Sequence, residues 1–111
     1  MANIFSLIPQ DLHRELFEEL TQGGAFRLER IVSRGHATPA GEWVDQDRDE
    51  WVVLLKGSAG LTIEGNKITM TMRPGDYVRL PARQKHRVEW TAPDTETVWL
   101  ALHYEPLQED H

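Results

Sequence analysis

The sequence predicts an all-β barrel or sandwich of short strands with one short helix in front of it. Two observations favour this fold class. After residue 24, apolar runs and alternating apolar–polar segments recur along the chain, which is typical of strands. Turn sequences such as Glu64-Gly65-Asn66 and Arg73-Pro74-Gly75-Asp76 separate these segments. A length of 111 residues indicates a single domain.

Residues 1–24 are expected to form a helical appendage. Pro9 stands where a helix can open, and Gly23-Gly24 stands where it would end. The apolar residues between them follow a helical spacing. They are Leu12, Leu16, Phe17 and Leu20.

Residues 25–106 are expected to form the barrel, with roughly seven or eight strands. The expected strands cover 25–33, 51–55, 61–63, 67–72, 77–80, 86–90 and 97–103. The run from Trp51 to Leu55 is apolar at every position, so it should be buried on both faces, and Glu50 stands at its start. Residues 107–111 are polar and are expected to be a frayed tail.

Composition excludes several classes of function. Eighteen acidic residues against 12 basic ones give a net charge of −6, which argues against nucleic acid and against an anionic membrane surface. There are no cysteines, so disulfides and thiolate metal ligands are ruled out. No signal-peptide pattern and no apolar run near the ~20 residues of a membrane span is present, so a cytoplasmic protein is expected.

Two spacing patterns resemble the motifs of a known family. Six residues separate Glu50 from Gly57, and Gly75, Pro81 and His86 follow in a second fixed spacing. These half-motifs, in this order, resemble those of the small single-domain cupins of the RmlC-like family. The resemblance implies a double-stranded β-helix, or jelly-roll barrel, that forms homodimers. It also implies a cavity with a divalent metal held by three histidines and one glutamate.

The chain departs from the cupin pattern at the metal-ligand positions. The pattern places a His-x-His pair three or four residues before the glutamate. A three-residue gap puts that pair on Val44 and Gln46, and a four-residue gap puts it on Trp43 and Asp45. Neither spacing supplies a histidine, so only the glutamate at position 50 and one histidine of the ligand set remain.

Four residues are nevertheless candidate metal ligands. Glu50 and His86 are the two that the motifs retain, and Gln46 or His103 would complete the set. Imidazole and carboxylate donors suit Fe, Mn, Ni or Zn. Each candidate has a structural alternative: Gln46 as a loop residue, His86 as a core histidine and His103 as an ordinary strand end. Glu50 would instead form an ion pair with Arg48, Arg83 or Arg87.

Two further motif positions differ from the pattern. Arg83 replaces a glycine, and Trp90 replaces a small polar asparagine. Alternation along residues 86–90 places Val88 and Trp90 on the same face as His86. We therefore expect Trp90, Met70 and Val88 to line the cavity.

Three functions follow, ordered by preference. The first is a metal-binding cupin, for which the family offers dioxygenase-like or isomerase-like enzymes. The second is a metal-free cupin that binds a small molecule as a sensor or binding module, without catalysis. The third is a scaffold, in which outward-facing Trp51, Val53 and Leu55 pack on a second protomer. The sequence does not decide whether the protein is an enzyme.

Overall fold

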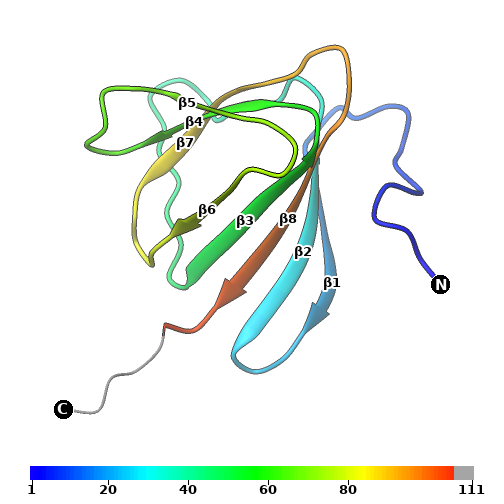
Figure 1. Cartoon of the computed structure of the whole chain (residues 1–111), viewed down its shortest axis with the longest axis horizontal. Helices are drawn as coiled ribbons and strands as arrows, with labels where there is room; N and C mark the ends of the chain where they lie inside the picture. Colours follow the sequence, from blue (N-terminus) through cyan, green and yellow to red (C-terminus); the bar gives the residue numbers. More distant parts are fainter. Residues whose placement is uncertain (107–111) are drawn as a thin grey trace.

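The computed structural model describes residues 1–106 and shows two antiparallel sheets that face each other (Figure 1). The expected tail, 107–111, lies outside the described residues. The strands are β1 (Leu16–Gln22), β2 (Phe26–Ser33), β3 (Asp49–Lys56), β4 (Ala59–Ile63), β5 (Met70–Met72), β6 (Tyr77–Leu80), β7 (His86–Thr91) and β8 (Thr97–Tyr104). One sheet has the order β1-β2-β8-β3-β6 and the other β5-β4-β7.

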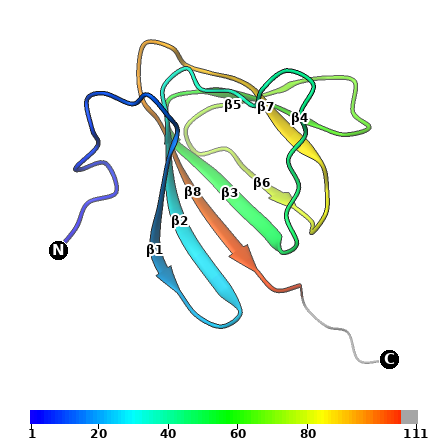
Figure 2. The same ribbon diagram turned by 180° about the vertical axis from the view of Figure 1, so that it is seen from behind.

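The core lies between the sheets because alternate residues of each strand point inward. In β3, Val52 and Leu54 are buried, whereas Trp51 and Val53 are only half-buried and face outward. The inward side chains form one apolar cluster of Val52, Leu54, Ala59, Leu61, Met72, Trp99 and Ala101. In Figures 1 and 2 the small sheet covers one end of the long strands, and the β1–β2 hairpin extends beyond it at the other end. The fold is the double-stranded β-helix that the resemblance to the cupins implies.

The expected helix is absent from the described residues, and that prediction is wrong. Leu16–Gln22 forms β1 instead, which pairs antiparallel with β2 from Leu16↔Val32 to Gln22↔Arg27. A short isolated helix is marginal in water, whereas pairing with β2 satisfies the backbone along the strand. The two glycines that seemed to end a helix belong to the hairpin loop, where the Gly23 amide donates to the Phe26 carbonyl.

The motif glycines occupy backbone conformations that favour glycine. Gly57 has φ of 87° and Gly75 has φ of 95°. Arg83, which replaces a glycine of the family pattern, also has a positive φ, of 67°. Its amide donates to the Gln46 carbonyl at 2.6 Å, so this conformation fixes the loop before β3 against the turn before β7.

Arg83→Gly is therefore expected to stabilise the fold or leave it unchanged, although glycine normally destabilises. A left-handed conformation costs a non-glycine residue about 1–2 kcal/mol, which the substitution by glycine recovers. The greater chain entropy of glycine in the unfolded protein offsets about 0.5–1 kcal/mol of this gain. Urea unfolding of the two proteins measures the difference. A loss of more than about 1 kcal/mol would show that the Arg83 side chain, and not its backbone conformation, matters here.

Candidate functional site

A cavity of about 150 Å³ lies between the sheets and contains the retained motif residues. Most of its walls are apolar and come from both sheets. Its lining consists of Glu15, Phe17, Glu29, Ile31, Thr38, Val44, Gln46, Glu50, Val52, Leu61, Leu80, His86, Val88, Trp99 and His103. All four candidate ligands predicted from the sequence therefore line one cavity.

Strand pairing brings the polar residues of this cavity together. Glu50, near the start of β3, is directly opposite His103 on β8 and Leu80 on β6. Residues opposite each other on neighbouring strands point to the same face of a sheet. His86 begins β7 in the opposing sheet and is held by a two-way backbone bridge to Val44. The two sheets thus supply the carboxylate and the imidazole from opposite walls.

Glu50 has a buried carboxyl group with one oxygen that makes no hydrogen bond within residues 1–106. The residue is 7% exposed, and its Oε1 has no hydrogen-bond partner among the described residues. The nearest imidazole nitrogen, Nε2 of His86, lies 3.9 Å from that oxygen. Burial raises the pKa of Glu50, and the neighbouring His103 and His86 only partly oppose this. A buried polar atom without a partner is costly, which is typical of a site that receives a ligand.

The two histidines are oriented by different neighbours. Nδ1 of His86 lies 3.0 Å from the carbonyl oxygen of Gln84, which leaves Nε2 to face Glu50. Nε2 of His103 lies 2.8 Å from Oε1 of Glu29, and its Nδ1 is buried without a partner in the portion that the structure describes. His103 is 3% exposed, so it is not the ordinary strand end that the sequence also allowed.

The sequence reasoning missed two acidic residues of the lining. Glu29 on β2 bonds His103, and Glu15, just before β1, accepts a hydrogen bond from the Ser33 hydroxyl. For Glu29 a signal existed: in an extended strand it shares a face with Ile31, which packs on the core. No such signal existed for Glu15, because its segment read as a helix.

The segment before β3 follows the three-residue spacing of the motif. Val44 and Gln46 line the cavity, whereas Trp43 and Asp45 do not. Gln46 and His103 also border a second, polar groove of about 350 Å³. Its remaining lining residues are Glu19, Gln22, Gly23, Arg27, Asp47 and Arg48.

The expected cavity wall of Trp90 and Met70 needs correction, because only Val88 of the three lies in the lining. A register shift in the β4–β7 pair sets Trp90 opposite Gly60 and Val88 opposite Leu61. This β-bulge breaks the alternation, so Trp90 does not share the face of Val88. Its ring covers Gly60, and the residue is 39% exposed.

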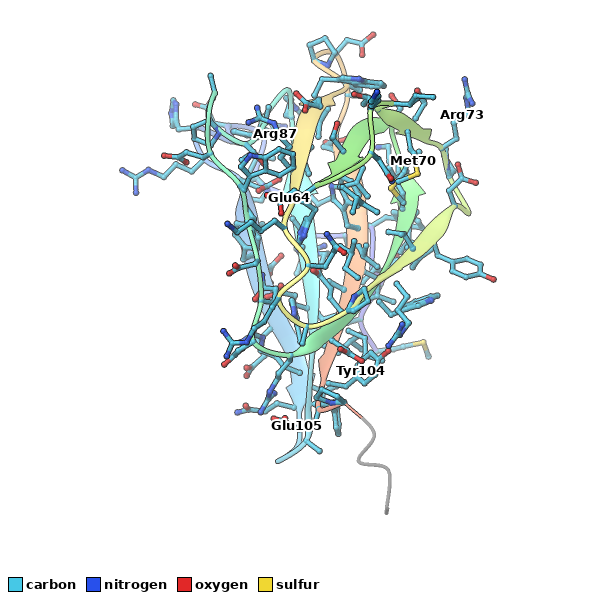
Figure 3. All side chains as sticks on the ribbon, turned by 90° about the vertical axis from the view of Figure 1, so that its left-hand side faces the viewer. Glu64, Met70, Arg73, Arg87, Tyr104 and Glu105 are labelled. Atoms are coloured by element: carbon cyan, nitrogen blue, oxygen red, sulfur yellow. The ribbon has the colours of Figure 1, made fainter. Side chains whose placement is uncertain are left out.

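Met70 belongs to the short strand β5 and is 37% exposed. Figure 3 shows it beside the small sheet, far from Tyr104 and Glu105, which mark the opposite end of the molecule. The side chain is therefore on the surface of the barrel and not in the cavity.

The donor set does not fit a resident metal. Among residues 1–106 no group of three or more His, Cys, Asp or Glu side chains is placed to hold one ion. Glu50 and His86 face each other, and His103, which bonds Glu29 through Nε2, does not converge with them on one point. A catalytic metal commonly needs three protein ligands. Gln46, the remaining candidate, would add only a neutral amide.

Comparison with known proteins agrees with the fold. A family profile described as "Cupin domain" matches residues 30–103. No curated protein matches the chain. No helix of residues 1–106 is long and apolar enough to cross a membrane.

Solved structures give the same result. A protein from Ralstonia eutropha JMP134, named as a candidate mannose-6-phosphate isomerase, is 42% identical, with a TM-score of 0.92 over 96% of this chain and 98% of its own. An RmlC-like cupin from Desulfovibrio desulfuricans is 17% identical, with a TM-score of 0.74 over 96% and 97%. An RmlC-like cupin from Methanocaldococcus jannaschii with a double-stranded β-helix fold is 17% identical, with a TM-score of 0.68 over 89% and 87%. Together with the profile match over most of the barrel, these similarities show that the chain belongs to the cupin domain family.

Proposed function

We propose that this cupin binds a small organic molecule in the cavity without a resident metal. One observation carries the proposal: the buried oxygen of Glu50 has no partner in the described part of the chain and faces His86 across a cavity with apolar walls. Apolar walls with a few convergent polar groups are typical of small-molecule sites. The apolar walls would supply affinity, and Glu50 and His86 would orient the ligand.

Val88→Trp is expected to fill the cavity and abolish binding. Val88 lies in the lining, and an indole in its place would occupy much of the space that a ligand needs. Ile68→Trp is the matched control, because Ile68 is 75% exposed and outside the cavity. A thermal-shift screen of small metabolites on the three proteins is the test. Hits that raise Tm equally in all three would contradict binding at this site.

A divalent metal is the second candidate, favoured by one observation. Glu50 Oε1 and His86 Nε2 lie on opposite walls, 3.9 Å apart, and two ligands could recruit a third. Under our proposal, protein purified without chelators contains far less than one metal per chain, and EDTA leaves its Tm unchanged. Stoichiometric Fe, Mn, Ni or Zn that is lost in His86→Ala would favour the metal-binding function instead.

We also propose that the chain forms a homodimer through the outer face of the large sheet. Trp51 packs against Tyr77 with ring centroids 5.4 Å apart, and Tyr77 is 67% exposed. Val53 and Leu55, on the same face of β3, are half-buried. An apolar sheet face of this kind favours a protein partner.

Val53→Glu is expected to convert the dimer to a monomer, because it places a charge in the proposed interface. Sedimentation velocity measures the change. Ile68→Glu, on an exposed turn, should leave the dimer intact. A wild-type protein that sediments as a monomer would overturn this part of the proposal.

A further inference from the structure

We infer that the ligand is a small monoamine whose protonated amino group binds between Glu50 and His86 while its apolar body fills the cavity. The inference rests on the proposed function and adds the chemical class of the ligand.

Each of the two histidines leaves one ring nitrogen as an acceptor. Nδ1 of His86 faces the Gln84 carbonyl oxygen, which can only accept, so Nδ1 carries the proton. In the neutral ring Nε2 is then an acceptor. Nε2 of His103 donates to the Glu29 carboxylate, so the buried Nδ1 of His103, which has no partner among residues 1–106, is an acceptor as well.

Glu50 adds a third acceptor to the same cavity. Its Oε1 is buried, has no partner among the described residues and lies 3.9 Å from Nε2 of His86. An ammonium group carries N–H donors and no acceptor, so it complements the pair formed by Glu50 Oε1 and His86 Nε2. Leaving buried acceptors unpaired is costly, and charge-assisted hydrogen bonds recover the most. A metal ion would use the same lone pairs, but three metal-binding side chains do not converge within residues 1–106.

The charge of the lining favours a cation over an anion. The lining contains three acidic residues, Glu15, Glu29 and Glu50, and neither lysine nor arginine. Ser33 bonds the first and His103 bonds the second, which leaves the Glu50 carboxylate available to a ligand.

The neighbouring groove does not supply an anion site either. Its Arg27 is 3.9 Å from Glu29, and its Arg48 is 2.8 Å from Glu105. Glu19 also borders the groove, so a carboxylate lies near each of its two arginines. A phosphorylated sugar, as the name of the Ralstonia protein suggests for that protein, would therefore bind poorly here.

The size of the cavity limits the body of the amine. A volume of about 150 Å³ accommodates a molecule near the size of benzene. Phe17, Ile31, Val52, Leu61 and Val88 provide apolar walls. A branched amine of roughly four to six carbons fits both the volume and the walls.

The test compares three probes of one shape and different charge: isopentylamine, isopentanol and isovalerate. Each is titrated calorimetrically into the full chain in buffer with EDTA, beside mannose 6-phosphate. The amine should bind about tenfold or more tightly than the alcohol, because bonds to a charged group are stronger. Isovalerate and the sugar phosphate should show no binding. Glu50→Gln should remove the preference for the amine, and Glu64→Gln, on an exposed turn, should keep it.

Other outcomes separate this inference from the proposed function. If the alcohol or the carboxylate binds as tightly as the amine and Val88→Trp blocks it, the amine inference is wrong and the cavity still binds a small molecule. If the amine binds only after a metal is added, the inference is wrong as well. If no probe binds, the inference fails, and the metabolite screen decides the proposed function independently.

Discussion

Glu50→Gln is expected to raise the free energy of unfolding at pH 7 by about 1–3 kcal/mol, because a neutral amide costs less to bury than a charged carboxylate. Burial raises the pKa of Glu50 above its ordinary value of 4.5. His103 on β8, His86 on β7 and Arg27 on β2 oppose this effect, and Glu29 on β2 adds to it. A glutamine of the same shape removes the buried charge.

The pH dependence follows from the sign of that shift. The folded protein holds the Glu50 proton to a higher pH than the unfolded chain does, because its pKa is raised. The wild type therefore loses stability as the pH rises from about 4.5, and the loss is complete above the folded pKa. Glu50→Gln should match the wild type at low pH and exceed it at neutral pH, as measured by urea unfolding across the range. A variant that is less stable at pH 7 would show that the Glu50 carboxylate makes favourable contacts in the folded protein that outweigh the cost of its burial.

Gly57→Ala is expected to reduce the free energy of unfolding by about 2–5 kcal/mol, the sum of backbone strain and overpacking. Gly57 has φ of 87°, and a Cβ there would lie 2.4 Å from Thr97 Oγ1 and 2.7 Å from the Glu96 carbonyl oxygen. The latter is backbone and cannot rotate away. The close approach of position 57, directly after β3, to Glu96 and Thr97 at the start of β8 thus leaves no room for a Cβ and favours glycine there.

Gly65→Ala is the control for this prediction. Gly65 has φ of 95°, but no atom lies within 4 Å of its added Cβ. Gly65→Ala should reduce the free energy of unfolding by only about 1–2 kcal/mol, which is the contribution of backbone strain alone. Equal losses in the two variants would show that the contact with β8 contributes nothing.

Strand positions were predictable where the apolar pattern was strong. The run after Glu50 and the alternation at 77–80 correspond to β3 and β6. Residues 16–22 were not predictable as the strand β1. Leu16 and Leu20 satisfy a helical spacing, and leucine and glutamate favour helices. Only pairing with β2, a contact between distant backbone groups, determines the outcome. Local sequence does not encode that contact.

The candidate site was predictable in part for a similar reason. Motif spacing located Glu50 and His86, and strand periodicity located Val88. Periodicity failed at Trp90 because a β-bulge between Gly60 and Leu61 changes which face the side chain occupies. The partner of His103 could not be predicted, since Glu29 lies 74 residues away in the sequence.

A crystal structure of protein purified without chelators, with anomalous data collected for transition metals, tests the central claim most directly. We predict density for a small organic molecule, or for water alone, against Glu50 Oε1 and His86 Nε2, with no anomalous peak in the cavity. An anomalous peak about 2.0–2.2 Å from His86 Nε2 and from a Glu50 oxygen would contradict the account and make this a metal-binding cupin.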